Sequence, residues 1–138
     1  MEPGTSFAKL DFDSGERFVR LRNELGIESF GLNLVLLEPG QGSRIHRHER
    51  QEEAYVVLEG ELTLVIEGGE EHTLAYGDAA RVAPEVRRQL INRGTGRLAI
   101  LAMGGATPHD GRDGMAFLSW EDGEPKSPAD VPLPDDVK

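Results

Sequence analysis

The chain has 138 residues, a formal charge of −10 at pH 7, 38% hydrophobic residues and no cysteine. Its length suits one domain, and its negative field makes nucleic acids and anionic membranes poor partners. Without cysteine there are no disulfides or thiolate sites, and without an apolar run of roughly 18 residues or a signal segment we expect a cytoplasmic protein.

Short apolar runs alternate with glycine-containing turns along most of the chain, a rhythm typical of an all-β sandwich or barrel. Residues 16–26 fit either an edge strand or a helical turn, since Leu21 and Leu25 lie one turn apart; we predict a strand followed by a turn. The clearest strands are 30–37, 53–58, 62–66, 71–75, 79–82, 88–92 and 98–103.

Local patterns support this assignment in the middle of the chain. Leu62, Leu64 and Ile66 alternate with other residues and therefore share one face of a strand. Gly68 and Gly69 follow at once, and glycine readily adopts the positive φ that a tight hairpin requires.

The composition changes at residue 121. Residues 121–138 contain six acidic residues, two lysines and four prolines. Proline interrupts both helices and sheet ladders, and such a density of charge is typical of a solvated chain. We therefore predict an irregular or disordered, solvated tail.

A polar run in the first half of the chain contains the best candidates for chemistry. On an extended strand, His46 and His48 point to the same side, about 7 Å apart along the chain. Glu53 opens the next strand and completes a 2-His-1-carboxylate set, which suits Fe(II), Mn(II), Ni(II), Zn(II) or Cu(II). Gln51 is a candidate ligand contact at the mouth of such a site. Dense polar runs are also common as solvated loops.

The other histidines and the remaining motifs carry less information. His72 lies in a polar strand and His109 in a loop, and we predict both at the surface. The chain contains no serine triad, phosphate-binding glycine loop or dinucleotide fingerprint, so no nucleotide cofactor is expected.

The histidines belong to a longer pattern that includes two glycines. It is Gly40, five residues, His46-x-His48, four residues, Glu53, six residues and Gly60. This pattern matches the first signature motif of the cupin superfamily at every position. The chain therefore resembles cupins over roughly residues 30–103.

The resemblance has consequences for fold, assembly and site. It implies a double-stranded β-helix, or jelly-roll barrel, with residues 1–29 as an N-terminal arm with edge strands, 30–104 as the barrel and 105–138 as a C-terminal extension. It also implies a homodimer. The two motif histidines and the glutamate would face into the barrel, where cupins usually hold a divalent metal.

The second cupin motif is only partly kept. The spacing from Gly77 to Asn92 fits, but Arg88 stands where the motif has a third metal-binding histidine. Its guanidinium stays protonated and cannot be a metal ligand. A divalent ion about 5 Å away would be repelled by roughly 6–7 kcal/mol at an effective dielectric near 20.

Two interpretations follow. In the first, the metal is bound by His46, His48 and Glu53, while Arg88 holds the anionic group of a small-molecule substrate; the protein is then a metal-dependent enzyme such as an oxygenase or isomerase. In the second, Arg88 takes the place of the metal and pairs with Glu53, and the barrel is a non-enzymatic binding or sensing module. A fold alone does not decide between them.

Overall fold

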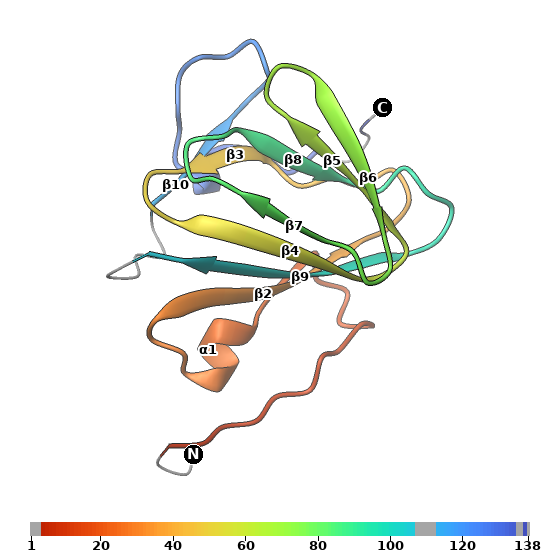
Figure 1. The fold of residues 1–138 in the computed structure, drawn as a ribbon, viewed down its shortest axis with the longest axis vertical. Coiled ribbons are helices and arrows are strands. Elements are labelled where there is room, and N and C mark those ends of the chain that lie inside the picture. Colours follow the sequence, from red (N-terminus) through yellow and green to blue (C-terminus); the bar gives the residue numbers. More distant parts are fainter. Residues whose placement is uncertain (1–3, 107–112, 135–136, 138) are drawn as a thin grey trace.

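The computed structural model describes residues 4–106, 113–134 and 137, which form two facing antiparallel sheets (Figure 1). The elements are β1 (Phe18–Arg20), α1 (Leu21–Leu25), β2 (Phe30–Leu37), β3 (Ile45–His48), β4 (Glu52–Glu59), β5 (Glu61–Ile66), β6 (Glu70–Ala75), β7 (Ala79–Val82), β8 (Arg88–Ile91), β9 (Leu98–Gly105), β10 (Gly114–Phe117) and the 3₁₀ turn η1 (Pro128–Asp130). One sheet has the order β1-β2-β9-β4-β7 and the other β10-β3-β8-β5-β6. The predicted all-β jelly-roll architecture is confirmed.

All seven strands predicted from the sequence are present, with ends within two residues of the expected ones. Three further strands, β1, β3 and β10, complete the sheets. The ambiguous N-terminal segment contains both structures that were weighed, because β1 runs directly into the single helical turn α1. Leu21 at the start of that turn is buried, and Gly26 ends it with a φ of +70°.

The main core lies between the two sheets. Its members come from strands of both sheets and include Val35, Leu37, Val57, Leu90 and Ile100. Burial of each such side chain contributes roughly 1.5–3 kcal/mol relative to exposure. The alternation predicted for β5 is present as well, since its first two face-sharing leucines belong to this core and its terminal isoleucine packs against it.

A second apolar cluster covers the outer face of the β1-β2-β9-β4-β7 sheet. Leu21 from α1 packs there with Leu34, Leu36 and Ala99. The central strands of this sheet are therefore apolar on both faces, which explains why β2 and β9 appear in the sequence as almost continuous apolar runs.

Two glycines of the first motif are required by the backbone. Gly40 and Gly60 have φ values of +86° and +81°, a region that side chains disfavour. At Gly60 an added Cβ would also lie 2.4 Å from the carbonyl oxygen of Arg97. Gly40 turns the chain after β2 and Gly60 turns it between β4 and β5, so the two turns bracket the segment that carries the site residues.

The C-terminal strap, defined as residues 121–134, lies against the barrel. Lys126 and Ala116 exchange two backbone hydrogen bonds of 2.9 Å, and η1 follows. Val131 is only 4% exposed. The predicted irregular chain is present here and most of its side chains are exposed, but the segment docks on the barrel and does not extend freely into solvent. Proline prevents a regular ladder, but it leaves carbonyls and apolar side chains that can dock.

Two arginines tie the strap to the barrel rim. Arg44 Nε donates to the Val131 carbonyl at 2.8 Å, and Arg17 Nη1 donates to the Pro134 carbonyl at 2.8 Å. Because Arg44 lies immediately before β3, the end of the strap is anchored next to the histidine-bearing strand.

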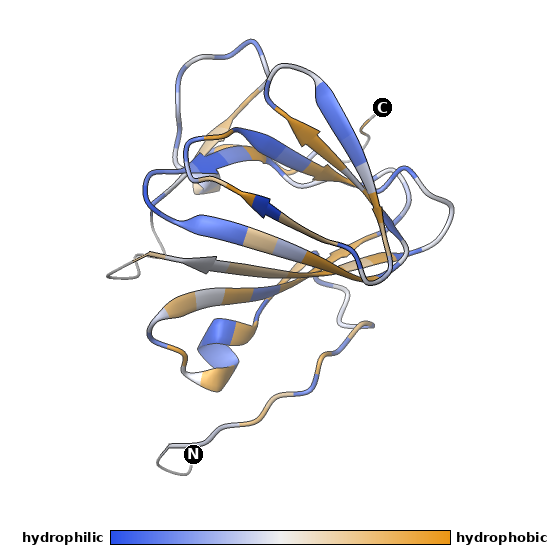
Figure 2. Cartoon of the chain, in the orientation of Figure 1, coloured by the Kyte–Doolittle hydropathy of each residue, from blue (hydrophilic) through white to orange (hydrophobic). Residues whose placement is uncertain are grey.

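One end of the barrel is polar. The loop from β3 to β4 and the start of β4 are hydrophilic, whereas the rest of β4 becomes hydrophobic toward its end (Figure 2). Within the described ranges, neither helical segment is long and apolar enough to cross a bilayer.

Candidate functional site

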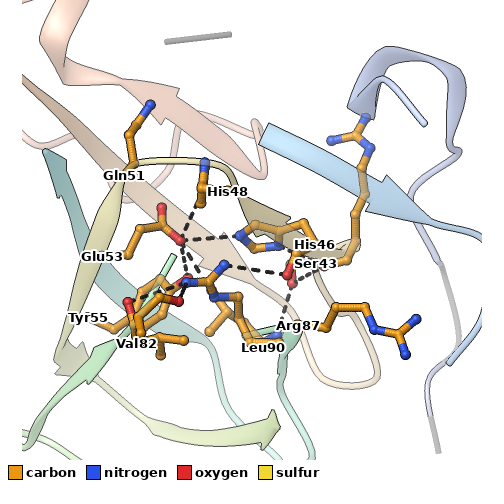
Figure 3. Close-up of polar contacts among 12 residues, drawn as sticks. Ser43, His46, His48, Gln51, Glu53, Tyr55, Val82, Arg87 and Leu90 are labelled. Atoms are coloured by element: carbon orange, nitrogen blue, oxygen red, sulfur yellow. Dashed lines mark hydrogen bonds and ion pairs between the residues drawn. The ribbon is translucent and has the colours of Figure 1, made fainter. Parts of the chain in front are cut away.

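The two histidines and the glutamate predicted as ligands converge at the polar end of the barrel. His46 Nε2 and His48 Nε2 lie 3.3 Å and 3.2 Å from Glu53 Oε1, and one ligand atom from each residue falls within 4.8 Å of the others. The histidines come from β3 and the glutamate from β4 in the facing sheet. Figure 3 shows both rings and Tyr55 turned toward the carboxylate of Glu53.

The second nitrogen of each imidazole is fixed from outside the group. His46 Nδ1 lies 3.1 Å from the carbonyl oxygen of Arg44, and His48 Nδ1 lies 2.8 Å from Asp113 Oδ1. Both partners only accept hydrogen bonds, so each Nδ1 carries the proton. In the neutral rings, each Nε2 therefore directs a lone pair toward the carboxylate.

Asp113 is a site residue that the sequence did not predict. It is buried, and its Oδ2 accepts hydrogen bonds from the backbone N–H groups of Arg50 at 3.0 Å and Gln51 at 2.8 Å. Burial alone would raise the pKa of Asp113, but these bonds and the contact with His48 lower it. A carboxylate on the outer nitrogen of a metal-binding histidine fixes its tautomer and increases its basicity.

No sequence signal links Asp113 to His48, because 65 positions separate them. The link arises from strand pairing: β10 runs antiparallel to β3 and places Gly114 opposite His48. Asp113, the residue before Gly114, then lies next to the loop from β3 to β4.

Tyr55 supports the glutamate. It is 1% exposed, and its hydroxyl donates to Glu53 Oε1 at 2.5 Å. Burial and the charge of Glu53 raise the pKa of Tyr55 well above its usual value, so the phenol remains a donor. A signal was available here, since Glu53 and Tyr55 are two residues apart on one strand and share a face.

The charge of Glu53 is maintained by its neighbours. Burial alone would raise its pKa, but the contacts with His46 and His48 hold it well below the usual range. Likewise, burial alone would lower the pKa of His48, but the carboxylates of Glu53 and Asp113 outweigh burial and raise it. The lowered pKa of Glu53 and the raised pKa of His48 both mean that a positive charge is favoured where these side chains meet.

Arg88 is placed differently from either expectation. It lies directly opposite His46 across β3 and β8, but it is 0% exposed and does not line the cavity. Its terminal nitrogens donate to backbone carbonyls, Nη2 to Ala83 at 3.1 Å and Nη1 to His46 at 3.5 Å. The prediction that Arg88 holds an anionic ligand is therefore not supported.

Arg88 and Glu53 do form an ion pair, but the distance between them is long. Arg88 Nε lies 3.9 Å from Glu53 Oε1, which is farther than either histidine nitrogen. The guanidinium thus stands behind the carboxylate as a buried counter-charge. It does not displace the imidazoles.

Gln51 also lies outside the cavity. It is buried, its Nε2 donates to Asp113 Oδ1 at 2.7 Å, and in Figure 3 its side chain points away from the group. Its predicted role as a ligand contact is not supported, and it helps to hold the loop. Of the remaining histidines, His72 is exposed on β6 beside Glu70, as predicted, and His109 lies outside the described residues.

A cavity of about 240 Å³ opens beside the converging residues. Its lining combines apolar side chains such as Phe18, Val35 and Leu90 with the polar residues Asn33 and Arg44. Drug-sized sites have about 300–1,000 Å³, so this cavity suits a smaller molecule.

The residues fit a divalent metal ion. Two nitrogen donors with fixed tautomers and one ionised carboxylate form a set that suits Fe(II), Mn(II), Ni(II), Zn(II) or Cu(II). His48 Nε2 is buried and has no hydrogen-bond partner among the residues described, which a metal ion would remedy. The buried charge of Arg88 opposes the ion and should weaken its binding relative to a four-ligand site.

Comparisons with known proteins agree with this description. A family model described as "Cupin domain" matches residues 33–104, just over half of the chain. A sugar phosphate isomerase from the cupin superfamily of Silicibacter pomeroyi is similar in structure, with 30% sequence identity, a TM-score of 0.63 and coverage of 95% of this chain and 100% of that chain. None of the curated proteins compared with the chain matches it.

Two further solved structures are similar. A cupin protein from Bacteroides fragilis has 23% identity and a TM-score of 0.66, covering 77% of this chain and 86% of that chain. The cupin domain of an XRE family transcriptional regulator from Enterobacter cloacae has 25% identity and a TM-score of 0.57, covering 65% of this chain and 97% of that chain. From the matched motif, the fold and these similarities, the chain belongs to the cupin superfamily.

Proposed function

We propose that this cupin binds a divalent metal ion through His46, His48 and Glu53 and presents it to a small molecule in the adjoining cavity. The observation that carries the proposal is the pair of Nε2 lone pairs, each fixed by an acceptor on Nδ1, that meet a third acceptor, Glu53 Oε1, at 3.2–3.3 Å. With neutral rings this arrangement is repulsive, and either a proton on an Nε2 or a metal ion among the three atoms relieves the repulsion.

The surrounding residues support this role. Asp113 fixes the tautomer and orientation of His48, and the carbonyl of Arg44 does the same for His46. Tyr55 donates to Glu53 and keeps its carboxylate in place. His46, His48 and Glu53 would hold the ion, which would supply a Lewis acid that polarises a carbonyl or hydroxyl group of the bound molecule.

Among metal-dependent reactions, we propose isomerisation of a small hydroxylated carbonyl compound as the first candidate. Support comes from the neighbour described as a sugar phosphate isomerase, which has 30% identity and matches nearly the whole chain. The small, mixed polar and apolar cavity is compatible with such a substrate. An oxygenase is the alternative within the same metal-dependent class.

A non-enzymatic sensing module is the second candidate. The buried charge of Arg88 near Glu53 disfavours a metal ion, and one similar structure is the cupin domain of a transcriptional regulator. In this case the cavity binds its ligand without turnover. The homodimer and the cytoplasmic location remain predictions.

Metal binding is tested with protein purified without a histidine tag. We expect about one equivalent of Mn(II), Ni(II), Zn(II) or Fe(II) after loading and dialysis, and a loss of most of it in H46Q, H48Q and E53Q. H72Q, which changes an exposed histidine outside the site, is the matched control and should load like the wild type. Less than about a tenth of an equivalent in the wild type with every metal would contradict the proposal.

The reaction class is tested with the loaded protein in D₂O and a panel of aldose and ketose phosphates. An isomerase that moves a proton between neighbouring carbons should introduce deuterium beside the carbonyl group of its substrate, which NMR detects. Binding without deuterium incorporation would favour the sensing module, and oxygen consumption would favour an oxygenase.

A further inference from the structure

We propose that Arg44 is the residue that recognises an anionic group, a carboxylate or a phosphate, on the small molecule bound in the cavity. This inference deepens the proposed function and depends on the same cavity. It assigns to Arg44 the role that the sequence suggested for Arg88, whose guanidinium is fully buried and bonded to backbone carbonyls.

The position of Arg44 suits this role. It lines the cavity together with His46, His48 and Glu53, and it is partly exposed. Its backbone is fixed, because its carbonyl oxygen lies 3.1 Å from His46 Nδ1. An anion held by Arg44 would therefore lie in the same cavity as the metal-binding group.

One nitrogen of the Arg44 guanidinium is held by a hydrogen bond, and the other two remain available to donate. Nε donates to the Val131 carbonyl of the C-terminal strap at 2.8 Å. Within the described ranges, the two terminal nitrogens of Arg44 have no hydrogen-bond partner. Those two nitrogens form the edge of the guanidinium fork that binds carboxylates and phosphates in a bidentate manner.

Arg44 lies in an acidic protein, which has 25 acidic and 15 basic residues. In the described part of the chain, no carboxylate lies within 4.0 Å of its guanidinium. Five other arginines do have such a partner: Arg81, Arg87, Arg88, Arg93 and Arg97. Other described arginines without one, such as Arg47, do not line the cavity. A partly buried cation without an acidic partner at a cavity wall is a ready binding point for an anion.

A second arginine lies close to Arg44. Arg17 Nη1 donates to the Gly42 carbonyl at 3.1 Å, which places it close to Arg44. Burial and the charge of Arg17 lower the pKa of Arg44. A bound anion would relieve this repulsion.

The cavity also limits the rest of the ligand. Its volume of about 240 Å³ and its apolar wall of Phe18, Val35 and Leu90 suit a short carbon chain. Asn33 offers an amide that has no hydrogen-bond partner among the described residues. The expected ligands are small hydroxy or oxo acids and phosphate esters of a few carbons.

The test measures binding of inorganic phosphate and of glycolate by titration calorimetry, with metal-free and metal-loaded protein. We expect R44Q to weaken binding of the preferred anion at least tenfold, R44K to restore part of it, and the preferred anion to identify phosphate or carboxylate as the natural group. R47Q is the matched control: it removes the same charge three residues further along the chain, on the other face of β3, over Phe117. Melting curves confirm that each variant folds.

Two results would overturn the inference: equal anion affinity in R44Q and the wild type, or no saturable binding of either anion by the wild type. The proposed function fails separately. If the wild type takes up no metal but loses anion affinity on the R44Q change, Arg44 recognition stands and the metal-dependent function does not. If R44Q loads metal normally and binds anions like the wild type, the metal-dependent function stands and the role of Arg44 does not.

Discussion

The site is built from two segments of the chain, one that contains all three candidate ligands and one that lies about 60 residues further along the sequence. β3 and the start of β4 supply the three metal-binding candidates within eight consecutive residues, His46 to Glu53. The C-terminal part, residues 113–134, supplies Asp113, the cavity wall residues Gly114 and Pro128, and the carbonyl that holds Arg44. The first segment contributes the donor atoms, and the second determines how they are held.

This difference shows that residues close in sequence provide the donor atoms, whereas remote residues orient them. Donor atoms on two consecutive strands that face each other across the barrel follow from period two and a short loop. Their tautomers and orientation depend on residues that strand pairing and docking bring from elsewhere. Changes in the second segment should therefore alter stability and affinity without removing a ligand.

The largest expected effect comes from removing the C-terminal strap by truncation after Trp120. Loss of the buried Val131 and of the hydrogen bonds to Ala116, Arg44 and Arg17 should lower the free energy of unfolding by about 3 kcal/mol. We expect the melting temperature to fall by about 10 °C in calorimetry. Truncation after Pro134, which keeps the strap, is the control; equal melting temperatures for both truncations would show that the strap contributes nothing.

The next effect concerns the counter-charge in the barrel. Arg88→His should tighten metal binding about a hundredfold, or about 2.7 kcal/mol, because it removes a buried positive charge and offers a third imidazole opposite His46. Arg88→Met separates the two causes, since it relieves the charge without adding a ligand. Titration of both variants with Zn(II) measures the difference, and unchanged affinity in both would mean that Arg88 does not oppose the metal.

A smaller effect should follow from Asp113→Asn. The amide can still accept from the backbone N–H groups of Arg50 and Gln51, but it no longer presents a carboxylate to His48. Metal affinity should fall about 10–100-fold, as for other partners on the outer nitrogen of a ligand histidine. Nitrogen-15 NMR of His48 provides a readout that a general loss of stability would not change, because the proton should leave Nδ1 in part of the molecules.

The same variant predicts a dependence on pH. Because folding lowers the pKa of Asp113, its contribution to stability is complete above its unfolded pKa of about 3.9 and disappears as the pH falls through the lower folded value. The difference in unfolding free energy between wild type and Asp113→Asn should therefore narrow below about pH 4. If this difference in unfolding free energy persists at lower pH, the stabilisation by Asp113 comes from packing and not from its charge.

Much of the fold could be predicted because it depends on local patterns. Short apolar runs between glycines gave seven strands, and the spacing around Gly40 and Gly60 reflects backbone conformations that other residues disfavour. The strap was missed for a physical reason: its composition is that of a solvated chain, and its docking depends on Val131 and on backbone carbonyls, which every residue possesses.

The site was predictable to the same extent. The donors His46, His48 and Glu53 follow from residue type and period two, and the position of Arg88 beside them was predictable from the second motif. The direction of its guanidinium was not, because nearby carbonyls compete for it. Asp113 could not be inferred, since only the pairing of β10 with β3 brings it to His48.

The most direct test of the central claim is a crystal structure of the protein soaked in Zn(II), with anomalous density collected at the zinc edge. The account predicts one strong peak at about 2.0–2.2 Å from His46 Nε2, His48 Nε2 and a carboxylate oxygen of Glu53. The account would be contradicted if a saturating Zn(II) soak gave no peak among these atoms, or only a peak bound by surface residues.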